Sequence, residues 1–505
     1  MTEKEDKNLI TRAPVVVILG HVDHGKSSIL EAIKNLKITE KESGGITQHI
    51  GAYEIEHQGK KITFIDTPGH EAFSAMRSRG AKVADVAVLV VAADEGVKEQ
   101  TKEAISHIEK AKIPMVVAIN KMDKPEANPE KVKRELAKEG VIVESMGGKV
   151  PSVELSAKTK KGISDLLELI LLIAEMEELK ADISRPAQGV VIESFLDNFR
   201  GPTATLILKE GILKKGEIIG TSSTLGRARI LEDFQGKPIK EAYPSQPVRV
   251  IGFNEVPMVG EVFNVFKTLE EAERNTKSES KKSEASFSSE EEEKKSLNLI
   301  LKTDVLGSLE AIEEMLKNLP LSLEKVQESK ITLKIIKKEV GDITESDIKL
   351  AKSANAIIVG FKVKVDNIAK NLAIREKIKI RTFDVIYELK ESIKKALEEM
   401  LEPEIVRADL GKIKILAIFR TEKNRQIIGG RVIEGKVRRG ALVEVIRNDE
   451  NIGGGKIVGL KKQKEDINEA TKGTECGILY EGDVQIDVGD VLAVYVEEKR
   501  KIELK

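Results

Sequence analysis

Cysteine, net charge and long hydrophobic runs are scarce in this sequence, and each absence excludes a class of protein. The single cysteine, Cys476, allows no internal disulfide and fits a reducing compartment. The longest uninterrupted apolar run, Val86–Ala93, is far shorter than the ~20 residues of a membrane span. The N-terminal residues MTEKEDKNLI do not combine a cationic start with an apolar stretch, so no secretory signal is visible. We therefore expect a cytoplasmic protein with no membrane partner.

Histidine residues, and local excesses of basic or acidic residues, also occur only in parts of the chain. All six histidines precede Asn120, which excludes histidine-based chemistry from the rest of the chain. The 83 basic residues balance the 84 acidic ones, so the net charge of −1 gives no global sign of nucleic-acid binding. Locally, residues 411–440 hold nine basic residues against two acidic ones, whereas residues 481–490 hold four acidic residues and no basic one. Any contact with RNA must therefore come from a confined basic patch.

The 505 residues suggest three or four domains at ~150 residues each. The first third alternates short apolar runs with amphipathic stretches, which is typical of a mostly parallel sheet with helices on both faces. Expected strands span residues 14–19, 61–65, 85–93, 114–120 and 150–155, and expected helices span residues 27–36, 101–112, 129–139 and 164–178.

The pattern changes several times after this region. Strand-like segments with Gly-rich turns indicate a β-barrel, and residues 276–295 contain six Ser, six Glu and five Lys, which indicates a flexible linker. An α/β pattern follows, with strands at 297–301, 331–336 and 356–361 and helices at 309–319 and 345–353. We divide the chain into a tail (1–13), an α/β domain (14–183), a β-barrel (184–272), a linker (273–296), a three-layer α/β domain (297–384), a long connecting helix (385–402) and a C-terminal β-barrel (403–505).

One internal repeat is visible. Residues 210–216 (EGILKKG) match residues 434–440 (EGKVRRG), and about fifty residues later the copies carry VGE at 259–261 and VGD at 488–490. Both copies are consistent with simple basic hairpins. Two matching elements at similar separation favour two related barrels.

A phosphate-binding loop follows the first expected strand. Residues 20–27 read GHVDHGKS, the G-x-x-x-x-G-K-[ST] pattern between a strand and a helix. The glycines let backbone N–H groups surround phosphates, Lys26 supplies a positive charge, and the Ser27 hydroxyl can ligate Mg²⁺. Two loop histidines suggest a metal site, but without a companion cysteine or suitably placed acid we favour packing within the loop. The assigned residues are Gly20, His21, Val22, Asp23, His24, Gly25, Lys26 and Ser27.

Three further motifs follow expected strands. Asp66 can hold Mg²⁺ through water, and the Gly69 N–H can meet a γ-phosphate. A buried Asp123 carboxylate can accept the N1–H and 2-amino N–H of guanine, a donor pair that adenine lacks. Residues 156–158 would bring a backbone N–H to guanine O6. The assigned residues are Asp66, Thr67, Pro68, Gly69, Asn120, Lys121, Met122, Asp123, Ser156, Ala157 and Lys158.

These motifs predict a guanine-nucleotide site with GTP or GDP and Mg²⁺, because open α/β sheets bind ligands at the carboxyl ends of their strands. His70 is placed to orient the water that attacks GTP, and Thr47 would ligate Mg²⁺ only in the GTP state. Arg77 and Arg79 are candidate arginine fingers. Their helical context, residues 74–82, favours a solvated face instead, so we expect slow intrinsic turnover and activation by a partner.

The loop GHVDHGK at 20–26 together with DTPGH at 66–70 resembles the translational GTPases. Residues 44–53 (GGITQHIGAY), 90–96 (VVAADEG) and 120–129 (NKMDKPEANP) look like bacterial translation initiation factor two. The similarity continues at residues 189–194, 297–304, 343–347, 434–440 and 475–477, so it covers nearly the whole chain except the linker.

The resemblance implies a GTPase domain, a β-barrel, an α/β domain, a connecting helix and a C-terminal barrel, the order read above. It implies a monomer that places formylmethionyl initiator tRNA on the small ribosomal subunit together with other initiation factors. It also implies that the protein promotes joining of the large subunit and hydrolyses GTP on the ribosome. In that family the residue matching His70 is catalytic. The last barrel grips the aminoacyl end through positions matching Lys461, Lys462, Lys464, Glu475, Cys476 and Gly477.

The chain departs from the family at two positions of this barrel, with Gln463 where an aromatic residue is usual and Gly430 where a cysteine is frequent. The resemblance thus locates the site without specifying its contacts to formylmethionine. Without the resemblance, the residue types predict that Cys476 is a small buried hydrophobic residue. They predict that residues 461–464 form a solvent-exposed basic edge. Only Met1–Ala13 precede the first strand, so we expect no anchoring by the long N-terminal extension common in the family.

Two other functions stay open. An elongation-type factor that delivers aminoacyl-tRNA shares the histidine motif, although the α/β domain and helix of residues 297–401 argue against it. A nucleotide-modifying enzyme, such as a P-loop kinase or a sulfate-activating GTPase, would need a second catalytic cluster, and no such cluster follows the first domain.

Overall fold

The computed structural model describes residues 8–34, 50–69, 71–279, 296–319, 331–401, 404–463 and 465–500. The chain forms two compact units, residues 1–397 and 398–505, which are described separately below. Of the predicted features, Thr47, His70, Lys464 and most of the linker lie outside the described residues.

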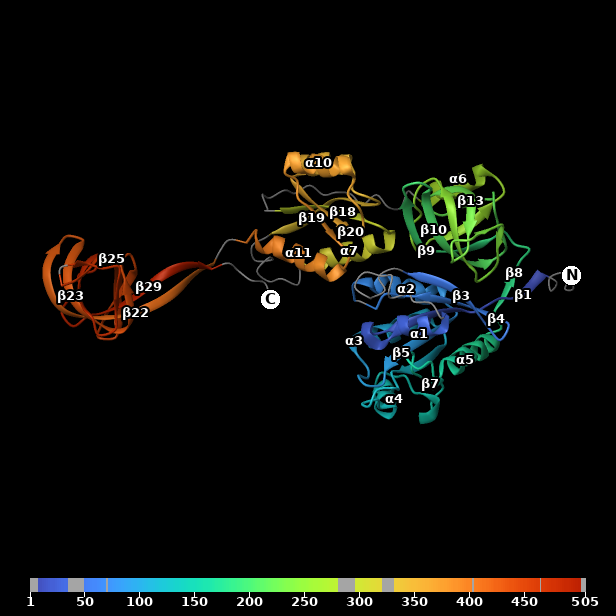
Figure 1. The fold of residues 1–505 in the computed structure, drawn as a ribbon, viewed down its shortest axis with the longest axis horizontal. Helices are drawn as coiled ribbons and strands as arrows, with labels where there is room; N and C mark the ends of the chain where they lie inside the picture. The colour runs from blue at the N-terminus through green and yellow to red at the C-terminus, as the bar shows by residue number, and fades with distance from the viewer. Residues whose placement is uncertain are drawn as a thin grey trace. The chain divides into compact units, whose positions relative to one another are not determined.

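A six-stranded sheet forms the centre of the first domain, in the order β3-β4-β2-β5-β6-β7 (Figure 1). All neighbours are parallel except β3 and β4, so the expected mostly parallel sheet is confirmed. Strands β2 and β5 are completely buried, because helices cover both of their faces. The strands are β2 (Val15–Gly20), β3 (Gly51–His57), β4 (Lys60–Asp66), β5 (Val86–Ala92), β6 (Met115–Asn120) and β7 (Ser152–Glu154).

Helices cover the sheet on both sides. Helices α1 (Lys26–Lys34) and α5 (Ile163–Met176) share one apolar core with β2, β4, β5 and β6. Helices α2 (Ser74–Val83) and α3 (Glu99–Ala111) pack against each other, and both contact β2. Helix α4 (Pro129–Lys138) begins at an Asn128 cap whose side chain accepts the Lys131 N–H. This arrangement leaves the carboxyl ends of the strands to the loops that carry the motifs.

Each unit contains a β-barrel, and the two barrels share one topology. When the six strands that close each barrel are numbered along the chain, both barrels have the order 3-6-1-2-5-4. The first barrel uses β9 (Gln188–Asp197), β10 (Gly201–Glu210), β12 (Ile218–Gly220), β13 (Leu225–Glu232), β16 (Pro247–Phe253) and β17 (Val262–Phe266). The second uses β22 (Glu404–Glu422), β23 (Arg425–Arg438), β24 (Leu442–Arg447), β25 (Glu450–Lys462), β28 (Glu475–Gly482) and β29 (Val491–Arg500). The repeat therefore marks two related barrels, as predicted.

The α/β domain has a four-stranded parallel sheet, ordered β19-β18-β20-β21. Its elements are β18 (Ser296–Thr303), α7 (Leu306–Asn318), β19 (Thr332–Val340), α9 (Glu345–Ala354), β20 (Ala356–Phe361), α10 (Asn367–Glu376) and β21 (Ile380–Phe383). The sequence did not predict α10 or β21. Helix α10 buries only Ala369 and Ala373, so it lacks the stripe of large apolar residues that marks a helix.

Two predicted segments differ in the structure. Helix α6 (Leu269–Glu279) includes residues 273–279, which the sequence assigns to the linker. Ala272 is buried, and Thr276 Oγ1 lies 3.0 Å from the Ala272 carbonyl oxygen and 3.4 Å from that of Thr221. Helix α11 (Ile386–Glu398) ends earlier than the predicted connecting helix. Its Ile386, Leu389, Ile393 and Leu397 are fully buried, so most of this helix belongs to the core of the first unit.

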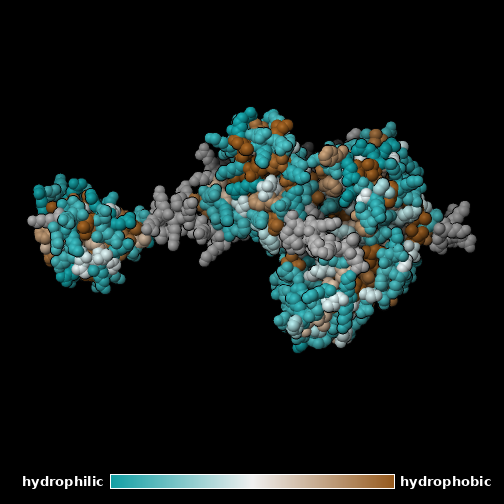
Figure 2. All heavy atoms as spheres, viewed as in Figure 1, coloured by the Kyte–Doolittle hydropathy of each residue, from teal (hydrophilic) through white to brown (hydrophobic). Residues whose placement is uncertain are grey.

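The surface drawn in Figure 2 is mostly hydrophilic, with hydrophobic residues in small groups. Among the described residues, no helix has both the length and the apolarity that a membrane crossing requires.

Candidate nucleotide-binding site

The loop between β2 and α1 has the geometry of a phosphate cradle. It passes through a short 3-10 turn (Val22–His24), and α1 starts directly at Lys26, so the first N–H groups of the helix point into the loop. The Lys26 ammonium is buried and donates to the carbonyl oxygens of Gly20 (3.0 Å) and His21 (2.7 Å). The lysine is thus held at the phosphate position by the loop itself.

Burial changes the protonation of Lys26. Desolvation lowers the pKa of this lysine from 10.5 to about 8, assisted by the positive charge of Arg77 and opposed by the negative charge of Asp66. A phosphate group beside the ammonium would favour its charged form. Binding of an anion and protonation of Lys26 are therefore coupled.

The two loop histidines pack within the protein. His24 is fully buried, with Nδ1 at 3.4 Å from the Val90 carbonyl oxygen, and desolvation lowers the pKa of its ring to about 4. The rings of His21 and His24 are 4.9 Å apart. His24 is consequently neutral at physiological pH and acts as part of the loop's support.

The end of β4 lies against this loop. Asp66 is completely buried at the last position of the strand, and the Thr67 hydroxyl donates to the Ile18 carbonyl oxygen at 2.9 Å. A Cβ atom at Gly69 would lie 2.8 Å from Val22 Cα and would also collide with the Lys26 ammonium. Only glycine allows this close approach, so the turn is in contact with the phosphate loop, as the motif predicts.

Asn120 connects the phosphate end of the site with its base end. The side chain is buried at the end of β6, where Nδ2 donates to the His24 carbonyl oxygen (3.0 Å) and Oδ1 accepts the Ala157 N–H (3.1 Å). One amide therefore joins three of the four predicted motifs. The structure brings these motifs together at the carboxyl edge of the sheet.

Asp123 differs from its prediction in one respect. It is exposed, because it stands three residues beyond the end of β6 on the surface of the loop. Its Oδ1 accepts the Ser156 hydroxyl at 2.7 Å, and this hydrogen bond lowers the pKa of the carboxyl group. The carboxylate is thus ionised and oriented without being buried.

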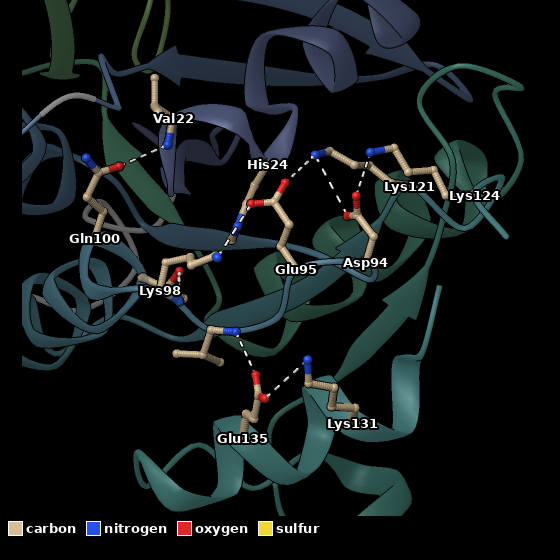
Figure 3. Close-up of polar contacts among 12 residues, drawn as sticks. Val22, His24, Asp94, Glu95, Lys98, Gln100, Lys121, Lys124, Lys131 and Glu135 are labelled. Atoms are coloured by element: carbon tan, nitrogen blue, oxygen red, sulfur yellow. Dashed lines mark hydrogen bonds and ion pairs between the residues drawn. The ribbon is translucent and has the colours of Figure 1, made fainter. Parts of the chain in front are cut away.

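The segment after β5, residues 94–100, contacts both ends of the site (Figure 3). Glu95 accepts from Lys121 at 3.0 Å, and Asp94 accepts from Lys124 at 2.5 Å. At the start of α3, the Gln100 side-chain oxygen accepts the Val22 N–H at 3.0 Å. No sequence signal pointed to Gln100, because its partner lies 78 positions earlier in the chain.

The expectation of a solvated face for α2 is wrong. Arg77 is completely buried and forms an ion pair with Glu103 of α3, and Arg79 pairs with Glu310 of α7. The cause is that α2 lies between α3 and the α/β domain, so both arginines face protein. Neither guanidinium group is available as a solvent-exposed arginine finger.

In the second unit, the described candidate residues of the C-terminal barrel fall on two neighbouring strands. Lys461 and Lys462 are exposed at the end of β25, and Lys461 is directly opposite Gly477 of β28. Glu475 is exposed and pairs with Arg431 at 2.5 Å. These positions form one edge of the barrel surface.

Cys476 faces the other way. It belongs to the barrel core, its Sγ lies 3.7 Å from the Gly430 carbonyl oxygen, and burial raises the pKa of the thiol to about 11. The interpretation as a small buried hydrophobe is confirmed. Gly430 stands opposite Cys476, and a Cβ at this glycine would lie 2.6 Å from Ile413 Cγ2, so a cysteine at residue 430 would require the core to move.

Four known families match successive parts of the chain. Elongation factor Tu GTP binding domain matches residues 11–176, Elongation factor G domain 2 matches residues 186–266, Translation-initiation factor 2 matches residues 270–394, and Elongation factor Tu domain 4 matches residues 410–493. With the architecture described above, these matches confirm the predicted order of GTPase domain, barrel, α/β domain and second barrel.

Three similar proteins share one name. Translation initiation factor IF-2 of Pelotomaculum thermopropionicum is 45% identical over 520 residues, which cover 100% of this chain and 53% of the relative. The same-named proteins of Carboxydothermus hydrogenoformans (45% over 514 residues; 99% and 61%) and Thermotoga petrophila (46% over 513 residues; 99% and 73%) are also similar. The chain thus spans 53–61% of the length of the first two.

A solved structure is similar over nearly the whole chain. It is GDP-bound aIF5B from Aeropyrum pernix, with a TM-score of 0.50 and 26% sequence identity over 96% of this chain and 92% of the other.

Proposed function

Since the chain belongs to the translation initiation factor IF-2 family, we propose that it is a cytoplasmic, monomeric GTPase of translation initiation. It binds formylmethionyl initiator tRNA and the small ribosomal subunit, acts with other initiation factors, promotes joining of the large subunit and hydrolyses GTP when the ribosome stimulates it. The observation that carries the GTPase part of the proposal is the Asn120 side chain, which joins the phosphate loop to the 156–158 loop. The similarity to initiation factors supports the part in translation initiation.

The nucleotide would lie along the carboxyl edge of the sheet. The N–H groups at the start of α1 and the Lys26 ammonium would hold the phosphates, and the Asp123 carboxylate would accept the two guanine donors. The Ser27 hydroxyl and, through water, Asp66 suit Mg²⁺, which prefers oxygen ligands. Thr47 would complete the magnesium shell in the GTP state. The similarity to a GDP-bound protein supports guanine nucleotides as the ligand.

For hydrolysis, we assign His70 as the residue that orients the attacking water. It follows Gly69, whose turn is in contact with the Val22 and Lys26 end of the phosphate loop. We expect His70→Ala to bind GTP normally and to lose ribosome-stimulated hydrolysis, measured as phosphate release with and without ribosomes. Undiminished stimulated turnover in this variant would refute the assignment.

For the tRNA, we assign the exposed edge of the C-terminal barrel formed by Lys461, Lys462, Glu475 and Gly477, with Lys464. Because Cys476 faces the core, its contribution would be to pack this edge. Filter binding of formylated and unformylated initiator tRNA tests the assignment. Equal affinity for both tRNAs would favour the elongation-type alternative.

The basic patch of residues 411–440 limits the number of RNA contacts. Each phosphate contact adds to the salt dependence of binding, so a confined patch should give a shallow salt dependence. A steep dependence of tRNA affinity on salt concentration would count against a narrow contact.

A further inference from the structure

Arg77 is the largest fully buried side chain in the described part of the protein. A buried guanidinium ion is costly unless a carboxylate and further acceptors surround it. Glu103 supplies the carboxylate, since both of its oxygens accept from Arg77 Nη2, at 2.7 and 2.8 Å. The arginine is therefore held in one orientation between α2 and α3.

The same guanidinium group also contacts the segment that follows β4. Nη1 donates to the Pro68 carbonyl oxygen at 3.0 Å, and Nη2 is 3.5 Å from the Glu71 carbonyl oxygen. These two carbonyl groups flank residues 69 and 70 on either side. One side chain thus contacts both ends of the turn that carries the proposed catalytic residue.

The carboxylate that orients Arg77 is itself anchored. Glu103 accepts from His107 Nε2 at 3.2 Å, and the Ser74 hydroxyl lies 3.3 Å from the same nitrogen. Burial opposes ionisation of Glu103, but hydrogen bonds from His107, Ser74 and Arg77 lower its pKa to about 2. One turn before Glu103, at the start of α3, Gln100 contacts the phosphate loop. Helix α3 therefore gives the turn and the phosphate loop a common support.

We propose that Arg77 is a positioning residue for GTP hydrolysis, which holds the carbonyl groups of Pro68 and Glu71, on either side of positions 69 and 70, against Glu103 of α3. It does not act on phosphate, because its charge is paired with Glu103 and its donors are directed at the turn. The planar guanidinium group suits this task, since its fork of donors can serve two carbonyl groups and a carboxylate together. This inference rests on the proposed role of His70.

The test compares Arg77→Met and Arg77→Lys with Arg134→Met, a control in which an exposed arginine of α4 is replaced. For Arg77→Met we expect ribosome-stimulated kcat to fall about 30-fold, because a small displacement of a catalytic group has effects of this size. Affinities for GTP and GDP should stay within about twofold of the wild type. Arg77→Lys, which keeps the charge without the fork, should lie between Arg77→Met and wild type.

Two further measurements cover a variant that folds poorly. Millimolar guanidinium should restore part of the hydrolysis of Arg77→Ala without changing that of Arg134→Met. Glu103→Gln keeps one acceptor for Arg77, so it should fold and lower kcat by about threefold to tenfold at unchanged GTP affinity. Hydrolysis by Glu103→Gln at the wild-type rate would overturn the inference.

The results distinguish failure of the inference about Arg77 from failure of the proposed function. If Arg77→Met hydrolyses GTP like the wild type while His70→Ala does not, the positioning role is wrong and the role of His70 stands. If His70→Ala is also unaffected, the proposed function of the turn has failed. A loss of nucleotide affinity in Arg77→Met and Glu103→Gln that parallels the loss of kcat would also overturn the inference, since it would indicate that the ion pair supports the whole nucleotide site.

Discussion

Raising the pH from 7 to 8.5 should weaken binding of GDP and GTP through the deprotonation of Lys26. In the nucleotide-free protein, burial lowers the pKa of this lysine to about 8. Phosphate binds the ammonium form and favours it, so the complex retains the proton over this range. Affinity is therefore nearly complete at pH 7 and falls as the pH rises through about 8.

The magnitude follows from the fraction of Lys26 that is protonated in the free protein. With a pKa of about 8, this fraction falls from about nine tenths at pH 7 to about one quarter at pH 8.5, so Kd should rise about fourfold. At pH 8, binding should take up about half a proton. His24 does not contribute, because its pKa of about 4 keeps it neutral throughout.

Calorimetric titration with GDP at several pH values measures the Kd. Repeating each pH in two buffers of different ionisation enthalpy also gives the number of protons taken up on binding. The pH range of the titration, from 7 to 8.5, ends below the pH at which guanine N1 ionises. Lys26→Arg is the matched control, since a guanidinium group stays charged over the whole range and should abolish the pH dependence. A constant Kd for the wild type, or the same slope in Lys26→Arg, would refute the reasoning.

Three further predictions concern other sites. Asp123→Asn should shift the nucleotide preference from GTP toward XTP in competition binding, and unaltered GTP affinity would exclude the guanine contact. Arg12→Met should destabilise the first unit by about 2 kcal/mol in calorimetric unfolding, because it removes the arginine that contacts the buried Asp85 carboxylate at 2.6 Å and leaves Lys209, at 3.3 Å, as the remaining cation; an unchanged unfolding temperature would contradict this. Cys476 in the folded protein should react with iodoacetamide at pH 8 about 100-fold more slowly than in the unfolded chain, since its pKa rises from 9.0 to about 11; equal rates would show that the thiol is not buried.

The sheet of the first domain was largely predictable. Strands buried on both faces leave unbroken apolar runs, and each predicted strand and helix of this domain agrees with the structure within two residues where it is described. Strand β3 was missed because its sequence, GAYEIEH, mixes polar and apolar residues on a half-exposed edge. Local patterns thus identify buried elements better than edge elements.

The barrels were predictable for a different reason. A duplicated motif is informative because its two copies mark corresponding turns in the two barrels. The sequence of a single barrel offers no such comparison. The glycines at 211 and 216 have φ of 70° and 95°, and those at 435 and 440 have φ of 65° and 88°. The repeated glycines therefore reflect repeated left-handed backbone geometry.

By itself, the sequence determined the order of the domains and the positions of the four motifs along the chain. Both follow from short-range order: a strand, a glycine turn and a helix occupy consecutive residues, so the motif Gly20–Ser27 specifies its own geometry. Only the tertiary structure decided how Arg77 and Gln100 are used. Their partners Glu103 and Val22 lie 26 and 78 positions away. Helix packing alone brings such residues together, because the environment of a side chain depends on what the fold places beside it.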